Sequence, residues 1–188
     1  VIIAFHGWRS SWHRDFGMIS DFWYKNNCSV LYVEQRGQNN SSGEYMGFGL
    51  TERFDCLDWL NWEIERCGSD IPVYLAGVSM GATTVLMAAG LQLPPNVHGI
   101  MADCGFTSAN AIWEHIAKDN LHIRFGIRSA IADRMCRRKI QVGSKEHSTV
   151  EALKHTHVPV ILVHGADDHF VPVEMTYENY TACTAPKD

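Results

Sequence analysis

The chain has 188 residues, of which 46% are hydrophobic and 20% are charged, a composition typical of one globular domain. Its formal net charge of -5 argues against a nucleic-acid partner or an acidic membrane surface. No apolar run approaches the roughly 18 residues needed to cross a bilayer, so we expect no membrane span.

The cysteines indicate the cellular compartment of the protein, and the two chain ends indicate how complete the domain is. The cysteines are scattered without a C-x-x-C pair, and a chain of this length folds without disulfides, so we expect reduced thiols and a cytoplasmic protein. The chain opens with Val1 inside an apolar run and closes on Asp188 soon after a helical pattern. We therefore expect one domain over residues 1–188 that lacks strands at its N- and C-terminal ends.

Short apolar runs recur along the chain, and helical patterns separate them. The runs are aliphatic and nearly unbroken, as in strands buried on both faces. They cover Val1–Phe5, Val30–Val33, Val73–Ala76, Val97–Ala102 and Val158–Val163. The first helical patterns cover Asp15–Asn26, Thr51–Cys67 and Met80–Leu91. This alternation predicts an α/β fold, with a mostly parallel sheet and helices on both of its faces.

Two details of these helices can be checked in a structure. Phe16, Ile19, Phe22 and Trp23 share one face of the first helical pattern. At the start of the second, Thr51 is of the residue type that caps a helix N-terminus.

Residues 108–157 interrupt the alternation, because they contain no strand pattern. Helical patterns cover Ala109–Asp119, Ile127–Arg138 and Ser148–His155. An insertion of this length between core strands predicts a helical lid. The basic run Arg134–Lys139 lies within it, and a solvated helical face is favoured over an anion site.

The strongest chemical signal is Gly77-Val78-Ser79-Met80-Gly81, which joins an apolar run to a helical pattern. A serine on such a tight turn adopts strained backbone geometry and projects its hydroxyl above the sheet. Gly77 and Gly81 let the backbone pass closely on either side. The amide of Met80, at the start of the helix, then supplies half of an oxyanion hole. The alternative is a glycine-rich turn with an inert serine.

His6-Gly7-Trp8 comes directly after the first apolar run. A turn at this position can aim the amide of Trp8 at the same oxyanion, with Gly7 allowing the close approach. The alternative is that His6 and Trp8 are packing residues at a strand end. The Ser79 turn favours the oxyanion interpretation.

A third segment, His164–Pro172, also comes after a strand pattern and contains two adjacent carboxylates. Sites in open parallel sheets form at the carboxyl edge, where a carboxylate can orient a catalytic histidine. By position alone Asp167 or Asp168 fits this role, and so does Asp103 at the end of another strand pattern. A turn residue is the alternative for each of them.

Together these segments resemble the α/β-hydrolase superfamily of serine esterases and peptidases. His164–Pro172 is similar to the pattern H-G-x-x-D-x-x-V-P, which implies that Asp168 is the catalytic acid. Glu34–Gly37 with Ser41–Gly43 resembles the D-x-R-G-x-G-x-S-x-G loop. Two further stretches look like bacterial hydrolases of uncharacterised substrate, namely Gly47–Asp58 and Ala102–Ser108.

The chain departs from this resemblance at the general base. The resemblance implies the order Ser, Asp, His, but the only histidine after Asp168 is its neighbour His169, which cannot easily bind the acid and reach Ser79 together. His115 and His122, in the predicted lid, are the least implausible substitutes. A serine without a base is a poor nucleophile. We therefore expect the histidine to lie outside this chain, which by itself would be nearly inactive.

The sequence thus predicts a serine hydrolase of carboxylic esters or related acyl compounds, with a small-molecule acyl substrate. A non-catalytic hydrolase-like module that binds a ligand or partner is the alternative. Aromatic residues that could line an acyl pocket, or belong to the core, are Trp8, Phe106, Trp113 and Phe170. We expect no cofactor and no metal, because His164, Asp167, Asp168 and His169 share one loop and cannot all converge. The oligomeric state is left open.

Overall fold

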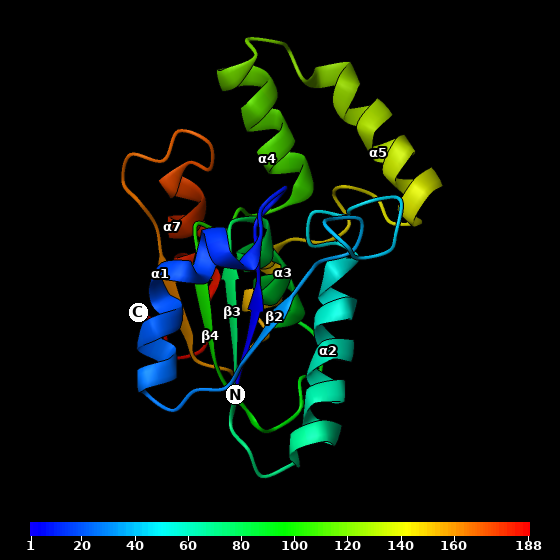
Figure 1. Cartoon of the computed structure of the whole chain (residues 1–188). Coiled ribbons are helices and arrows are strands. Elements are labelled where there is room, and N and C mark those ends of the chain that lie inside the picture. Colours follow the sequence, from blue (N-terminus) through cyan, green and yellow to red (C-terminus); the bar gives the residue numbers. More distant parts are fainter.

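The computed structural model describes residues 1–188 and contains one five-stranded sheet in which every pair of neighbours is parallel (Figure 1). The strands are β1 (Ile2–Phe5), β2 (Val30–Val33), β3 (Val73–Val78), β4 (Val97–Asp103) and β5 (Val160–Val163). Their order is β2-β1-β3-β4-β5. Helices cover the sheet on both faces, so the α/β fold expected from the sequence is confirmed.

The register of the sheet brings the ends of neighbouring strands together. Phe5 of β1 pairs with Val33 of β2 and with Gly77 of β3. On the other side, Asp103 of β4 pairs with Val78 of β3 and with Val163 of β5. The segments after β1, β3, β4 and β5 therefore meet at one edge of the sheet, where open parallel sheets bind ligands.

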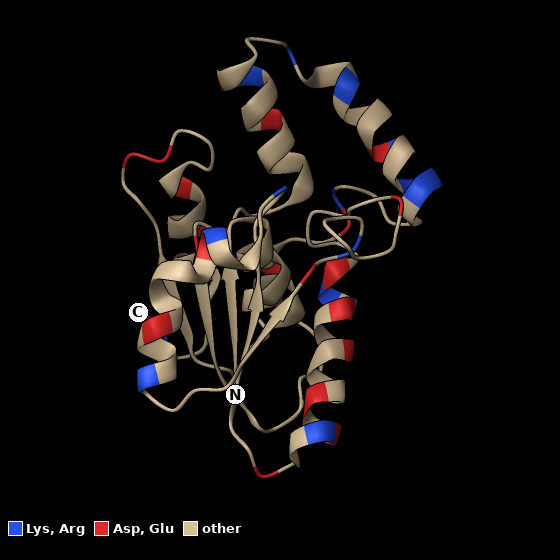
Figure 2. Cartoon of the chain, viewed as in Figure 1, with Lys and Arg blue, Asp and Glu red and all other residues tan.

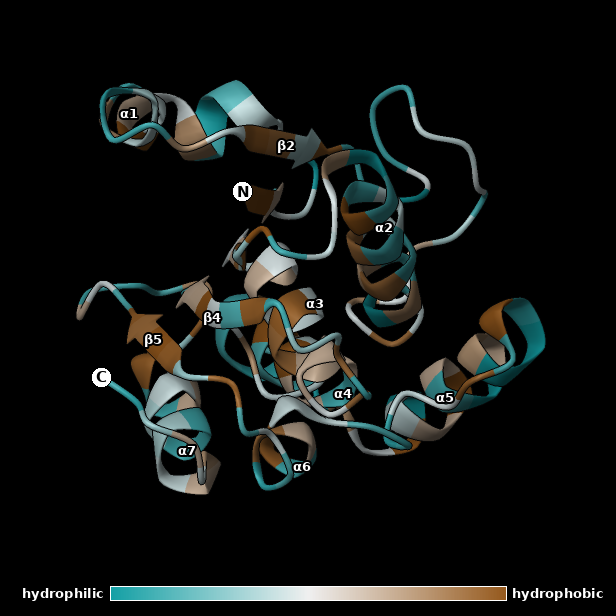
Figure 3. Cartoon of the chain, turned by 90° about the horizontal axis from the view of Figure 1, so that it is seen from below, coloured by the Kyte–Doolittle hydropathy of each residue, from teal (hydrophilic) through white to brown (hydrophobic).

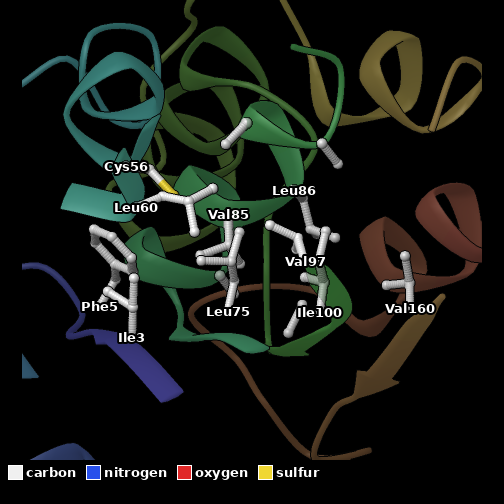
Figure 4. Close-up of a cluster of buried hydrophobic side chains, with 14 of the residues drawn as sticks. Ile3, Phe5, Cys56, Leu60, Leu75, Val85, Leu86, Val97, Ile100 and Val160 are labelled. Carbon is white, nitrogen blue, oxygen red and sulfur yellow. The ribbon is translucent and has the colours of Figure 1, made fainter. Parts of the chain in front are cut away.

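Side chains alternate between two apolar layers. On one face, Ile2 and Ala4 pack with Phe16 and Trp23 of α1 (Trp12–Lys25). On the other, Ile3 and Phe5 belong to the main core with residues of α2 (Glu52–Cys67) and α3 (Met80–Ala88) (Figures 3 and 4). This period of two, typical of a strand, lets four consecutive apolar residues of β1 bury both faces.

Burial is less complete at the rim of the sheet than the sequence indicates. Ile161 and Val163 of the edge strand β5 are 49% and 53% exposed. On α1, Phe16 and Trp23 pack against the sheet and are buried, whereas Ile19 and Phe22 are exposed, so only part of the apolar face of this helix contacts the sheet. An unbroken apolar run therefore does not distinguish a central strand from an edge strand.

The predicted cap of α2 is wrong. Thr51 has helical dihedral angles and makes no capping hydrogen bond. Instead the carboxylate of Glu52 accepts the amides of Gly47 (2.6 Å) and Gly49 (2.9 Å). A buried acid at the helix N-terminus thus fixes the preceding loop and complements the helix dipole.

The region 108–157 forms α4 (Ala109–His115), the π-helix η1 (Ile116–Asn120), α5 (Gly126–Ile140) and α6 (Thr149–Leu153). Helices α4 and α5 rise beyond the carboxyl edge of the sheet, whereas α6 packs on α3 and contributes Leu153 to the main core. Helix α5 carries most of the basic side chains of this region (Figure 2). None of the helices combines the length and apolarity needed to cross a bilayer.

After β5 the chain forms α7 (Val173–Ala182) and returns to the sheet. Lys187 forms a parallel bridge with Val160. Leu162 donates its amide to Asp188, and Asp188 donates its amide to Val160. Residues 187 and 188 thus extend the sheet beyond β5 in the same direction as the other strands.

Candidate active site

Ser79 lies in the turn between β3 and α3 with φ 53° and ψ -114°, outside the regions that a non-glycine residue ordinarily adopts. The neighbouring glycines cannot be replaced without movement. A Cβ on Gly81 would lie 1.8 Å from the carbonyl oxygen of Phe5, and one on Gly77 would lie 2.3 Å from the backbone of Gly81. The close approach of β1, β3 and α3 thus holds the strained serine in place.

Ser79 is half-buried and lines a cavity of about 370 Å³ at the carboxyl edge of the sheet. The other lining residues come from the turn after β1, the start of α1, the end of β3 and the segment after β5: Gly7, Trp8, Arg9, Ser10, Arg14, Asp15, Val78 and Phe170. The structure therefore brings Ser79, the Trp8 turn and the His164–Pro172 segment together, as the sequence indicates. Arg9, Arg14 and Asp15 were not anticipated.

The ring of His6 fixes the peptide that joins Gly7 to Trp8. His6 is buried, and its Nε2 accepts the amide of Gln35 at 3.3 Å. The proton must then sit on Nδ1, which donates to the carbonyl oxygen of Gly7 at 2.7 Å. In a trans peptide the N–H points away from the C=O, so the Trp8 amide faces away from the His6 ring. That amide donates to no protein acceptor.

Asp15 holds the same turn from its other end. One carboxylate oxygen accepts the amide of Gly7 at 2.7 Å, and the other accepts the hydroxyl of Ser10 at 2.5 Å. A Cβ placed on Gly7 would lie 3.3 Å from Cβ of Ser79, so this turn abuts the serine directly. Gly7 is thus anchored by His6 through its carbonyl and by Asp15 through its amide.

Residues of the loop after β2 connect this turn to α3. The side-chain amide of Gln35 donates to the carbonyl of His6 at 2.5 Å and accepts the hydroxyl of Thr84 at 2.9 Å. Arg36 forms a two-bond ion pair with Asp55 of α2, which raises the pKa of the guanidinium above its ordinary value. The Glu34–Gly37 stretch therefore connects the turn after β1 to helices α2 and α3.

In the segment after β5, Asp168 is the acid with a defined environment. Its Oδ1 accepts the amides of Phe170 (2.8 Å) and Val171 (3.0 Å). Val171 is buried and packs in one apolar cluster with Met80, the residue next to the serine. The loop that carries Asp168 therefore rests against the start of α3. Asp167, in contrast, is exposed and makes no side-chain hydrogen bond.

His164 has a structural role. Its Nδ1 contacts the hydroxyl of Thr176 at 2.5 Å, and its Nε2 lies 2.8 Å from the carbonyl of Val171. The Nε2 atom is also 3.6 Å from a carboxylate oxygen of Asp168. Both ring nitrogens of His164 therefore have partners, one in α7 and one in the loop that carries Asp168.

Asp103 and Cys104 lie at the end of β4 beside the serine. The carbonyl of Asp103 accepts the amide of Ser79 at 2.8 Å. Partial burial, together with the nearby charge of Asp168, raises the pKa of the Asp103 carboxyl above its ordinary value. Burial, reinforced by Asp103, raises the pKa of the Cys104 thiol to about 12. Its raised pKa keeps the Cys104 thiol protonated near neutral pH, which disfavours the thiolate that a cysteine nucleophile requires.

No histidine ring forms a hydrogen bond with the hydroxyl of Ser79. His115 has its Nδ1 2.9 Å from Asp119 and its Nε2 3.5 Å from the carbonyl of His169. With Asp168, His115, Asp119 and His169 line a second cavity of about 510 Å³, which Ser79 does not line. His122 is exposed in the connection between η1 and α5. The structure does not bring either substitute base to the serine.

The predicted aromatic residues divide between pocket and core. Trp8 and Phe170 stack with ring centroids 6.4 Å apart and line the Ser79 cavity. Phe106 is buried in the cluster that contains Met80. Trp113 lines a separate apolar groove of about 320 Å³ against α5. Sequence spacing could not make this division, because it depends on which loops lie side by side.

Comparison with solved structures shows the same fold over the whole chain. An esterase of Pyrococcus furiosus matches 100% of this chain and 71% of its own, with a TM-score of 0.74 and 18% identity. Est1E from Butyrivibrio proteoclasticus, solved with ferulic acid, matches 100% and 78%, with a TM-score of 0.72 and 17% identity. Mouse alpha/beta hydrolase domain-containing protein 10 matches 100% and 77%, with a TM-score of 0.66 and 19% identity.

At the sequence level the chain is similar to the uncharacterized protein YqkD of Bacillus subtilis, with 23% identity over 159 residues. The match covers 85% of this chain, which spans about half of that relative, 52% of its length. No protein-family model matches the chain.

Proposed function

We propose, starting from the α/β-hydrolase fold of this chain, that the protein hydrolyses carboxylic esters or related acyl compounds with Ser79 as its nucleophile. The observation that carries the proposal is the strained serine itself. Ser79 has a positive φ, stands between two glycines that tolerate no Cβ, and lines a cavity at the carboxyl edge of the sheet. Strain of this kind is retained where the surrounding structure enforces it, and it concentrates at active sites.

Two backbone amides are proposed to form the oxyanion hole. The amide of Met80 is at the N-terminus of α3, where the helix dipole favours negative charge. The amide of Trp8 belongs to the peptide that His6 and Asp15 hold beside the serine. Donors fixed before the reaction stabilise the developing oxyanion without reorganisation, and each is worth roughly 3–4 kcal/mol.

Asp168 is proposed as the acid of a Ser-Asp-His triad whose histidine lies outside these 188 residues. Two amides hold its carboxylate in the loop that packs against Met80. Lys187 pairs with Val160 in parallel, as in the other strands of the sheet. A strand that continued in this direction would end at the same edge as Ser79, where the histidine could then act as the base. The relative from Bacillus subtilis is about twice as long as the span that matches this chain.

In this mechanism the histidine removes the hydroxyl proton of Ser79 as its Oγ attacks the carbonyl carbon of the ester. The bond to the leaving-group oxygen breaks, and the imidazolium returns the proton to that oxygen. Water then attacks the acyl-enzyme with the same histidine as base, which releases the acid and regenerates the serine. Helices α4 and α5, above the sheet edge, are proposed to act as a lid over this site.

The test is hydrolysis of p-nitrophenyl acetate by the full-length protein. Ser79→Ala should lower kcat/KM by at least about 1,000-fold, the loss typical of a triad member. Ser69→Ala, in an exposed loop, is the matched control and should leave the rate unchanged. A fluorophosphonate should label Ser79 alone. Undiminished hydrolysis by Ser79→Ala would remove the serine from the mechanism.

A non-catalytic module that binds a ligand or partner is the second candidate, because no histidine contacts Ser79. The two candidates differ in the segment that each requires after Asp188. The enzyme requires a histidine after one further strand and gives turnover when that segment is present, whereas residues 1–188 alone should show almost none. A full-length protein with no such histidine and no labelling of Ser79 would favour the binding module.

A further inference from the structure

We propose that the Ser79 cavity contains an anion subsite formed by Arg9 and Arg14, which selects acyl substrates that carry a carboxylate. This inference rests on the proposed function and specifies its substrate class. Both arginines line the same cavity of about 370 Å³ as the serine. An ester bound at Ser79 would therefore place its neighbouring groups within reach of two guanidinium groups.

Neither arginine is neutralised by the protein. The chain carries a formal net charge of -5, and several of its other arginines form ion pairs with aspartate or glutamate. Arg9 and Arg14 have no carboxylate within 4 Å and are exposed to solvent. A carboxylate ligand would find unpaired cationic donors in a protein whose overall charge repels it.

The position of Arg9 is imposed by the surrounding structure. Its backbone has φ 52°, and its amide donates to the side-chain oxygen of Gln38 at 2.6 Å. The guanidinium carbon lies 4.9 Å from the ring centroid of Trp8, which in turn stacks on Phe170. The arginine is thus held on the aromatic wall of the cavity, and a strained non-glycine residue beside the nucleophile is a mark of a functional position.

The cavity is lined by two cationic side chains and one acidic side chain, so positive charge is in excess. The carboxylate oxygens of Asp15 accept the amide of Gly7 and the hydroxyl of Ser10, and they form no ion pair with either arginine. Arg14 lies in the first turn of the 14-residue helix α1, whose N-cap residue Ser11 makes no capping hydrogen bond. The uncapped amides of this turn add their partial positive charge to that of the two arginines.

A carboxylate suits these groups because a guanidinium binds it through paired, charge-assisted hydrogen bonds. The small cavity requires the anion and the scissile carbonyl to be only a few bonds apart. Two kinds of substrate satisfy this, namely monoesters of short dicarboxylic acids and esters with an acidic leaving group. Both kinds of substrate place a carboxylate at the two arginines.

The decisive measurement compares anionic with neutral esters on the full-length protein. p-Nitrophenyl hemisuccinate against p-nitrophenyl butyrate tests an anion on the acyl side, and 4-carboxyphenyl acetate against phenyl acetate tests the leaving group. We expect the ratio of kcat/KM to favour one anionic ester. Arg9→Gln or Arg14→Gln should lower that ratio roughly 10-fold, the effect of losing one charge-assisted bond.

Two controls separate this effect from general electrostatics. Lys145→Gln removes an exposed cation that lies outside the cavity and outside the proposed lid helices, and it should leave the ratio unchanged. Arg14→Lys keeps the charge but loses the paired hydrogen bonds, so it should retain only part of the preference. If Lys145→Gln lowers the ratio as much as Arg14→Gln, the preference comes from overall charge and the subsite is absent.

A binding experiment tests the subsite independently of turnover. Ser79→Ala protein should bind monomethyl succinate in calorimetry, and adding Arg9→Gln and Arg14→Gln should abolish the signal. Neutral-ester hydrolysis that depends on Ser79, combined with no anionic preference and no binding, would overturn this inference and leave the proposed function standing. Ester hydrolysis independent of Ser79 would overturn the proposed function instead.

Discussion

Helices α3 and α5 show how differently two helical patterns of one chain are used. All nine residues of α3 are buried, and the helix starts directly after Ser79. Of the fifteen residues of α5, only Ser129 is buried, and Ile127, Ile131 and Met135 are exposed. The sequence indicates a helix in both places, but it does not indicate that one helix is buried and the other exposed.

Packing accounts for the contrast. Helix α3 lies against β1, β3, β4 and α6, so each of its side chains has a fixed neighbour. Helix α5 touches the rest of the molecule mainly through α4 and the loop around Tyr45. Substitutions should therefore be costly in α3 and cheap in α5, and paired substitutions in the two helices can break or sharpen that expectation.

The largest effect is expected for glycine. Gly81→Ala should lower the free energy of unfolding by more than about 4 kcal/mol, or prevent folding, because its Cβ would overlap the backbone of Phe5. Gly126→Ala at the start of α5 has open space around it and should stabilise the protein by about 0.4–1 kcal/mol. Urea unfolding measures both, and equal tolerance at the two sites would contradict the close approach of α3 to β1.

Apolar truncation should give the next largest difference. Leu86→Ala in α3 removes a fully buried side chain from the main core and should cost about 2–5 kcal/mol. Ile131 of α5 is 55% exposed, so Ile131→Ala should stay within about 0.5 kcal/mol. Thermal unfolding of the two variants should differ by several degrees. A similar loss for Ile131→Ala would mean that α5 is covered in solution.

Buried hydroxyls provide a smaller contrast. Thr83 in α3 accepts the amide of Phe106 at 2.9 Å and donates to its carbonyl at 3.1 Å. Thr83→Val leaves both groups unpaired and should cost about 1–3 kcal/mol. The hydroxyl of Ser129 in α5 donates one hydrogen bond, to the side-chain oxygen of Asn110. Ser129→Ala should therefore lower the free energy of unfolding by about 1 kcal/mol. Chemical denaturation resolves the order, and a larger loss at Ser129 would reverse the comparison.

The smallest effect is expected for an ion pair of α5. Arg137 hydrogen bonds the carboxylate of Asp133 and holds its pKa below the ordinary value. The stability from this pair is present above the unfolded pKa of about 3.9 and is lost as pH falls through the lower folded pKa. Asp133→Asn should cost no more than about 1 kcal/mol at pH 7, because solvent screens the pair.

The pH profile checks this assignment. Unfolding free energies of the wild type and Asp133→Asn, measured from pH 7 downward, should converge once the pH falls below the lowered pKa of Asp133, where both side chains are neutral. A difference that persisted at low pH would show that the substitution acts through packing and not through charge.

Much of the fold could be predicted because its signals are local. The apolar runs place all five strands within two residues of their observed bounds. The glycines around Ser79 identify the strand-to-helix turn, because only glycine fits so close a backbone contact. The cap of α2 was missed because Glu52 reaches back to Gly47, a loop-to-helix contact that residue preferences do not encode.

The candidate site could be predicted only in part. Ser79, the Trp8 turn and the Asp168 segment each come after a strand pattern, so their meeting at one edge is a consequence of a parallel sheet. The roles of His6 and Asp15 could not be read in this way, because each depends on the course of the turn after β1. Nothing in the sequence associates Arg9 and Arg14 with Ser79, some seventy residues away.

The sequence by itself determined where strands, helices and the serine turn form, since hydrophobic period and glycine sterics act over a few neighbouring residues. Tertiary structure alone decided which loops share the serine cavity, which aromatic rings are core, and which acid is held by backbone amides. Those outcomes depend on the strand order β2-β1-β3-β4-β5. Strand order is a property of the whole packed chain, because burial of both sheet faces can be satisfied only collectively.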